Sequence, residues 1–414
     1  MRSPIIAATL LSIACAACTT ANATGSDSAT TDKTVVALGR KIFFDSTLSA
    51  SGRISCASCH NPAHAYAPAN GLAVQFGGPA LNVQGARAVP SLRYALNRTP
   101  VWYKEYVSSI AERAREGNEP PAGGFGEDGR FNSLHDQAAF PLLAPNEMAN
   151  HDSTDVVSKL KRASYAGEFR RVFGGRIFDV PEHAFTQALH AVERFELEDP
   201  SFHPYDSKYD RYLDGVAALT AQERRGLALF DDPRRGNCSA CHLDEKGADG
   251  SHPLFTDYQF EALGVPRNSE IRANRDSTYF DEGLCGPARQ DQRAQRDYCG
   301  MFKTPTLRNV ATRGAFFHNG RFHTLKAALQ FYVGRDADAE RWYPRAANGR
   351  LVKFNDLPPD LRGNADTVDL PLTRHAGQRA VWSDAEIDDV IAFLATLNDA
   401  DVTSAGTVVA SRRP

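Results

Sequence analysis

The sequence predicts a mostly α-helical chain built from two similar domains in tandem, and three observations lead to this prediction. The motif Cys-x-x-Cys-His occurs twice among the 414 residues, at positions 56–60 and 238–242. A segment whose apolar residues have helical spacing precedes each copy. Between the copies, residues 200–215 are rich in proline, tyrosine and aspartate, which is typical of a connector between domains.

The expected helices follow from apolar periodicity and from signals at their ends. Residues 39–45 and 226–232 resemble each other, because each combines a glycine with aliphatic residues and phenylalanine at helical spacing. The second of these helices should begin with the capping box Thr220-Ala-Gln-Glu223. Two further helices are expected, one with proline in its first turn and one with a capping box, at 181–198 and 383–397.

The repeated motif indicates a cofactor. Two thiols one helical turn apart can each form a thioether with a haem vinyl group, and the adjacent histidine then faces the iron. A redox dithiol or half of a zinc site is the alternative, but beyond the first 23 residues no other Cys-x-x-Cys unit exists to complete a zinc site. We therefore expect two covalently attached haem c groups, bound through Cys56, Cys59, His60, Cys238, Cys241 and His242.

The sequence contains the same unit twice: a helix, then the attachment motif, then an irregular segment that wraps the haem. This unit resembles a class I cytochrome c. The predicted fold class is therefore mostly α, with two tandem class I cytochrome c-like domains and one haem in each. We expect the first domain over residues 34–202 and the second over 203–400. A flexible N-terminal segment, 24–33, and a polar tail, 401–414, should flank them.

The first 23 residues have the features of a secretory signal peptide. Arg2 supplies positive charge, a short apolar run follows, and Ala21-Asn22-Ala23 is a cleavage site of the A-x-A type. Lipoprotein processing at Cys15 or Cys18 is the alternative, although the residues before each make a poor lipobox. We expect export to the periplasm. No later segment is apolar for long enough to predict an integral membrane protein.

The charge balance excludes one class of partner. The chain has 47 lysines and arginines against 50 aspartates and glutamates, for a net charge of −3. This composition gives no basic field of the kind that attracts nucleic acid. The sequence leaves open whether the chain forms a homodimer.

One cysteine pair remains after the two motifs and the leader. Cys285 and Cys299 lie in a long polar segment, and an exported protein works where disulfides persist. We expect a disulfide that closes this segment.

Three further motifs accompany the haem motifs: Asp128-Gly129-Arg130, Phe302-Lys-Thr-Pro305-Thr-Leu-Arg-Asn309, and Phe317-His318-Asn319-Gly320 followed by a helix. With them, the chain between about residues 35 and 397 resembles the bacterial dihaem cytochrome c peroxidase family, to which MauG belongs. The resemblance implies that the first domain is the peroxidatic one and the second transfers electrons.

The resemblance assigns Gln137 and Glu147 to the peroxide-binding side of the first haem. A pocket carboxylate can move the proton that O–O cleavage requires, and an amide can orient the peroxide. Family members typically keep a distal histidine there in the resting state, but this chain has none between His64 and His135. We expect the first haem to rest with an open or water-occupied site.

The resemblance places Tyr332 where typical members have the methionine ligand of the second haem. From the residues alone, a core aromatic is the alternative. A phenolate is a hard anionic oxygen that stabilises ferric and more oxidised iron, whereas thioether sulfur favours ferrous iron. Tyr332 as axial ligand therefore favours the MauG-like branch of the family.

The chain departs from the family pattern at three places. Glu127 stands where a tryptophan usually relays electrons between the haems, so either Trp102 or a tyrosine takes that role or the coupling between the haems is weaker. Ala88 stands where an asparagine usually binds calcium, so a calcium ion is in doubt. Residues 102–125 contain an insertion with the composition of a surface loop.

These features support three functions. The first is reduction of hydrogen peroxide to water with electrons from a small periplasmic cytochrome c or cupredoxin. The second keeps the peroxide chemistry but takes electrons from residues of a protein substrate, as MauG does. The third is a non-catalytic dihaem electron-transfer cytochrome, which the open first site disfavours because a carrier gains from two strong axial ligands.

Overall fold

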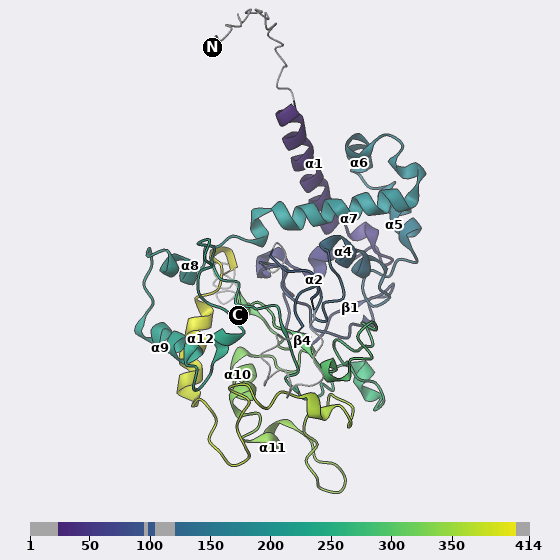
Figure 1. Cartoon of the computed structure of the whole chain (residues 1–414). Coiled ribbons are helices and arrows are strands. Elements are labelled where there is room, and N and C mark those ends of the chain that lie inside the picture. Colours follow the sequence, from purple (N-terminus) through teal and green to yellow (C-terminus); the bar gives the residue numbers. More distant parts are fainter. Residues whose placement is uncertain (1–23, 95–97, 104–120, 403–414) are drawn as a thin grey trace, which may run out of the picture.

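The computed structural model describes residues 24–94, 98–103 and 121–402, and over these residues the protein is mostly helical with long irregular connections (Figure 1). The first half contains α1 (Thr24–Phe44), α2 (Cys56–Cys59), α4 (Leu134–Leu143), α5 (Ser153–Leu160), α6 (Ala166–Phe173) and α7 (Pro181–Glu198). The second half contains α8 (Lys208–Leu213), α9 (Ala221–Asp231), α10 (Leu325–Gly334), α11 (Ala339–Trp342) and α12 (Asp384–Ala395). Two short antiparallel sheets pair β1 (Phe76–Gly77) with β2 (Val83–Gln84) and β3 (Phe260–Glu261) with β4 (Phe302–Lys303).

The predicted helix ends are confirmed at three places. α7 begins with Pro181 in its first turn, and the capping boxes that open α9 and α12 form at Thr220 and Ser383. At the N-terminus, residues 24–33 form the first turns of α1, although the sequence analysis expected a flexible segment. The predicted signal peptide, most of the insertion and nearly all of the tail lie outside the described residues. Within the described ranges, no helix is long and apolar enough to cross a bilayer.

Two large apolar cores lie one after the other along the chain. The first contains buried residues between Val35 and Phe202, and the second contains buried residues between Tyr209 and Leu397. A smaller third cluster surrounds the disulfide and includes Phe260. The domain boundary at 202/203 stays a prediction, which the separation of the two large cores supports.

In each half, a glycine lets two helices cross at very short range. A Cβ added to Gly39 of α1 would lie 1.8 Å from the carbonyl oxygen of Ala191 in α7. A Cβ added to Gly226 of α9 would lie 2.0 Å from the carbonyl oxygen of Asp389 in α12. In Figure 1, α7 crosses α1 at one side of the molecule, and α12 packs on α9 at another. Each crossing also packs two phenylalanine rings with centroids 5.5 and 5.2 Å apart, Phe43 with Phe195 and Phe230 with Phe393.

A hairpin of nearly the same sequence follows in each half. Residues 125–131 read Phe-Gly-Glu-Asp-Gly-Arg-Phe, and residues 316–322 read Phe-Phe-His-Asn-Gly-Arg-Phe. The outer phenylalanines form an antiparallel bridge in both hairpins. Gly129 and Gly320 both adopt positive φ, 61° and 59°, which favours glycine at this position.

The helix after each hairpin extends this equivalence. Ser133 caps α4 and Thr324 caps α10, each accepting a hydrogen bond from the backbone N–H three residues on. Counted from these caps, Pro141 in α4 is the counterpart of Tyr332 in α10. The same structural unit is therefore present twice, with different side chains at matching positions.

Buried ion pairs join the two halves. The guanidinium of Arg93, whose side chain is 1% exposed, donates to the buried Asp399 at 2.7 Å and also to the exposed Asp401 at 2.6 Å. Arg87 donates to both carboxylate oxygens of Asp281, at 2.7 and 2.8 Å. Removing one partner of such a buried pair costs about 3–5 kcal/mol, because the remaining charge stays buried.

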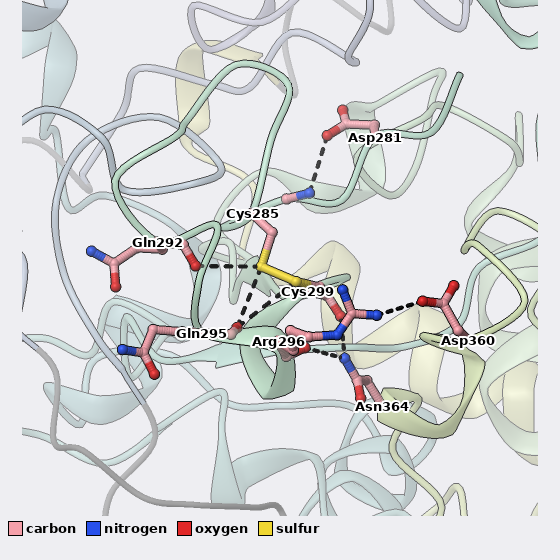
Figure 2. Close-up of a disulfide and its surroundings, with 9 residues drawn as sticks. Asp281, Cys285, Gln292, Gln295, Arg296, Cys299, Asp360 and Asn364 are labelled. Atoms are coloured by element: carbon pink, nitrogen blue, oxygen red, sulfur yellow. Dashed lines mark hydrogen bonds and ion pairs between the residues drawn. A yellow bond between two sulfur atoms is a disulfide. The ribbon is translucent and has the colours of Figure 1, made fainter. Parts of the chain in front are cut away.

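Cys285 and Cys299 form a disulfide that closes a loop of the second half (Figure 2). The backbone oxygen of Gln295 faces both sulfur atoms, and Arg296 forms an ion pair with Asp360 at 2.5 Å. The loop also carries Arg289, whose guanidinium lies 3.8 Å from the Trp102 ring centroid. Arg289 thus links this loop to the hairpin region of the first half.

Candidate functional site

One continuous cavity of about 770 Å³ is lined by both Cys-x-x-Cys-His motifs. Protein interiors leave few voids larger than a water molecule, so a cavity of this size calls for an occupant. Its walls combine aliphatic and aromatic side chains with a few polar groups, a lining that suits large, flat, mostly apolar cofactors. The cavity and the two motifs therefore fit two haem groups.

The histidine of each motif is oriented for axial ligation. Nδ1 of His60 lies 3.1 Å from the carbonyl oxygen of Tyr66, and Nδ1 of His242 lies 2.8 Å from that of Phe255. Because a carbonyl oxygen only accepts, each Nδ1 carries the proton and each Nε2 keeps its lone pair. Burial lowers the pKa of both imidazoles to about 4, so both rings are neutral at neutral pH. A neutral imidazole held through Nδ1 is a typical ligand of haem iron.

The four motif thiols suit covalent attachment better than redox or zinc chemistry. Burial raises the pKa of Cys56 to about 12 and that of Cys59 to about 11. Burial likewise raises the pKa of Cys238 and Cys241 to about 12. Thiols held protonated are poor zinc ligands and poor nucleophiles in thiol–disulfide exchange. Neither pair is joined in a disulfide, so all four sulfur atoms remain available for thioether bonds.

Gln137 and Glu147 both line the cavity, and the charge of Glu147 acts on Cys59, which places Glu147 near the first motif. Gln137 lies in α4, and Glu147 lies in the turn after it, where its carbonyl oxygen accepts from the N–H of Gly78 at 2.8 Å. Burial raises the pKa of Glu147 to about 7, and the positive charge of Arg130 opposes that rise. A carboxyl group that titrates near neutrality can both accept and return a proton.

Tyr332 lies in α10 and lines the cavity near the second motif, since Cys238 and Cys241 act electrostatically on its hydroxyl. Burial raises the pKa of the Tyr332 phenol well above its usual value. Its hydroxyl forms no hydrogen bond with the residues that the structure describes, which leaves the oxygen available to a ligand. The counterpart Pro141 has no side-chain donor atom, so the two halves differ at this position.

Glu127 lies where the two hairpins meet. Its backbone oxygen accepts from the N–H of Lys303, and the charge of His318 acts on its carboxyl group. Burial raises the pKa of Glu127 to about 7, and its Oε2 is buried without a hydrogen-bond partner in the described chain. Trp102 packs on Phe260 beside Gly129 of the same hairpin, but it is not among the residues that line the cavity. No described tryptophan therefore takes the place that Glu127 occupies between the hairpins.

Ala88 makes its contact at this point through its backbone alone. The N–H of Ala88 donates to the carbonyl oxygen of His318 at 2.7 Å, and its methyl group offers no oxygen to a calcium ion. The preceding residue, Arg87, places its guanidinium between Asp128 and Asp281. An arginine thus links the halves at this point.

The sequence indicated no function for Arg130 beyond its place in the family motif Asp128-Gly129-Arg130. The structure places Arg130 in the cavity lining with Gln137 and Glu147. The signal that could have found it is the likeness of residues 125–131 to 316–322, which identifies this hairpin as part of the repeated unit.

Comparisons with known proteins agree with this site. The family model for di-haem cytochrome c peroxidase matches residues 33–218. The methylamine utilization protein MauG of Paracoccus denitrificans is 31% identical over 378 residues, which cover 89% of each chain. The cytochrome c551 peroxidase of Nitrosomonas europaea is 28% identical over 342 residues, or 81% of this chain and 82% of that one. The crystal structure of the dihaem peroxidase BthA of Burkholderia thailandensis matches with a TM-score of 0.79 and 36% identity, covering 89% of this chain and 87% of that one.

The family model covers the first motif and the first hairpin, and the matches to MauG and BthA extend over 89% of the chain. The family binds two haems, which agrees with a cavity that two Cys-x-x-Cys-His motifs line. The chain belongs to the family of di-haem cytochrome c peroxidases that includes MauG.

Proposed function

We propose that the protein is an exported peroxidase that reduces hydrogen peroxide to water with electrons from a small periplasmic cytochrome c or cupredoxin. One observation carries the proposal: the repeated unit has Pro141 in one half and Tyr332 at the matching position of the other. His60 would hold a haem whose peroxide-binding side lies near Gln137 and Glu147. His242 and the phenol oxygen of Tyr332 would together hold the other haem.

The repeat also supports two tandem class I cytochrome c-like domains, each with a covalently attached haem c. Both halves contain the glycine crossing, the attachment motif, a carbonyl that orients the histidine, the hairpin and the capped helix in the same order. Such agreement across unlike sequences is expected of a duplicated unit. The peroxidatic domain is then 34–202 and the electron-transfer domain 203–400.

The residues near His60 suit peroxide chemistry. When bound, the first haem supplies a redox centre that binds peroxide and passes electrons to it. The Glu147 carboxylate can take a proton from one oxygen of the peroxide and return it to the other oxygen, which leaves as water. The Gln137 amide holds the peroxide by hydrogen bonds. With two electrons and two protons, one peroxide yields two waters.

A second function has its own supporting observation. Tyr332 would stabilise ferric or more oxidised iron at the second haem, so that oxidising equivalents are shared there until a protein substrate supplies electrons, as in a MauG-like enzyme. Peroxide turnover with a small reduced redox protein, measured beside peroxide-dependent oxidation of protein residues, separates the two functions.

Electron paramagnetic resonance of the as-isolated ferric protein tests both peroxidase functions. We expect one high-spin signal from the open haem, which stoichiometric peroxide removes, and one low-spin signal from the Tyr332-ligated haem. Two low-spin signals that peroxide leaves unchanged would refute the open site and support a plain electron-transfer cytochrome.

A further inference from the structure

We infer that Arg130 is an anion-binding residue of the peroxide pocket, whose guanidinium stabilises negative charge on the ligand near Glu147. The inference rests on the proposed open site at the first haem. It adds a third polar group to the pair that the sequence identified.

The position of Arg130 supports this role. Arg130 lines the cavity with Gln137 and Glu147, and its positive charge counteracts the effect of burial on the pKa of Glu147. Its guanidinium carbon lies 4.4 Å from the ring centroid of Phe140, which belongs to α4 one turn after Gln137. The cation is therefore held against the helix that carries Gln137.

The hydrogen-bonding capacity of Arg130 is only partly used. Nη1 donates to Asp128 at 3.0 Å, and the backbone N–H points to the same carboxylate at 3.4 Å. Nε is buried and has no hydrogen-bond partner among the described residues. Because a guanidinium has five N–H donors and a buried unpaired donor is costly, an acceptor that enters the cavity would satisfy it.

Asp128 holds this arginine in place. Its side chain is 0% exposed, and its Oδ2 accepts from Arg87 at 2.8 Å as well as from Arg130. Its backbone oxygen accepts from Arg289, in the disulfide loop, at 2.7 Å. Asp128 thus fixes Arg130 through contacts that reach the second half of the chain.

The second hairpin offers an internal comparison. Arg321 is the counterpart of Arg130, but Asn319 replaces Asp128 and carries no charge. The backbone N–H of Arg321 still donates to the Asn319 side chain, at 3.1 Å. The Arg321 side chain, however, is exposed and lies outside the cavity lining. The hairpin therefore directs its arginine into the cavity only in the half with the open site.

The positive charge of Arg130 would stabilise the anion that forms during proton transfer. When Glu147 takes the first proton from hydrogen peroxide, the bound oxygens become anionic until that proton reaches the leaving oxygen. An arginine N–H aimed at this charge stabilises it in a low-dielectric pocket. Arg130 also favours the ionised form of Glu147 that starts the transfer.

Fluoride titration of the ferric protein tests the role of Arg130 without measuring turnover. Fluoride binds open ferric haem as an anion that accepts hydrogen bonds, and its charge-transfer absorption reports occupancy. We expect Arg130→Gln to raise the fluoride Kd by about ten- to a hundredfold, as for a lost hydrogen bond to a charged group. Arg130→Lys keeps the charge and should raise the fluoride Kd less than Arg130→Gln does. Arg321→Gln removes the same charge at the matching position and should leave the Kd unchanged.

The fluoride titrations distinguish an anion-binding Arg130 from an arginine with another role. The variants are compared at equal haem content. If Arg130→Gln does not fold, Arg130→Lys takes its place in the comparison with the wild type. An unchanged Kd in Arg130→Gln, or an equal rise in Arg321→Gln, would overturn the inference, as would an unchanged Kd in Arg130→Lys where that variant alone folds. An unchanged fluoride Kd with a shifted potential of the first haem would assign Arg130 to a haem propionate instead. If the wild-type protein binds no fluoride, the open site of the proposed function fails, and this role for Arg130 fails with it.

Discussion

The pKa of Glu147 predicts how peroxide turnover depends on pH. Burial raises this pKa from 4.5 to about 7, so at pH 7 about half of the carboxyl groups are ionised. At about 1.36 kcal/mol per tenfold change, the pocket disfavours the carboxylate by about 3 kcal/mol. Because the carboxylate takes the proton, kcat/KM for peroxide should rise about tenfold per pH unit at low pH and level off above about pH 7.

Glu147→Gln keeps the shape of the side chain but cannot carry the proton. We expect kcat/KM to fall by about 10²- to 10⁴-fold and the dependence on pH near 7 to disappear. Stopped-flow mixing with peroxide from about pH 5 to about pH 9 measures both effects.

A second buried carboxyl group provides the control. Glu196 lies in α7, lines the same cavity, and burial raises its pKa to about 8. Its charge acts on Cys56, on the attachment side of the first motif. Glu196→Gln should keep the acid limb near pH 7 and most of the rate. A Glu147→Gln variant that keeps the wild-type pH profile, or a Glu196→Gln variant that loses it, would refute the assignment of the proton carrier.

Three further predictions concern the scaffold and the second haem. Gly39→Ala should destabilise the protein by about 1–3 kcal/mol, because the added Cβ would overlap the carbonyl group of Ala191. Gly167→Ala in α6 is the control, since its Cβ would meet open space and should leave the stability unchanged or raise it. Thermal unfolding of the two variants measures the difference. Replacing Cys285 and Cys299 together by serine should cost about 3 kcal/mol, as for a loop of about 15 residues, and reductant should lower the melting temperature of the wild type alone. Tyr332→Met should raise the reduction potential of the second haem by on the order of 100 mV, within the span of about 0.8 V that axial ligands cover. A redox titration measures this potential, and an unchanged value would mean that Tyr332 is not the ligand.

The sequence predicted those parts of the fold that leave a local signal. Periodicity and end signals predicted α7, α9 and α12, because the apolar face and the capping residues lie within one short segment. They did not predict α5 or α6, which have only eight residues each and depend on packing against α7 and α1.

The candidate site was predictable only where a motif is contiguous. The haem attachment residues follow from one spacing rule, whereas the position of Arg130 depends on how a hairpin packs against α4. Trp102 packs on Phe260 and is not among the cavity-lining residues, and its role as a relay stays a prediction. Residue type alone does not determine which side chains reach a cavity.

A duplicated unit gives both haems the same support, so the difference between them must arise from single positions. The crossing helices and the histidine contacts are shared, and they fix how each haem is held. The unit differs at Pro141 against Tyr332, and in the proposed function this difference leaves the site opposite His60 open and closes the one opposite His242. It differs again at Asp128 against Asn319, which decides whether the hairpin arginine enters the cavity. Pro141→Tyr should therefore close the first site and remove the high-spin signal of the ferric protein, since Pro141 and Tyr332 stand at the same position counted from their helix caps.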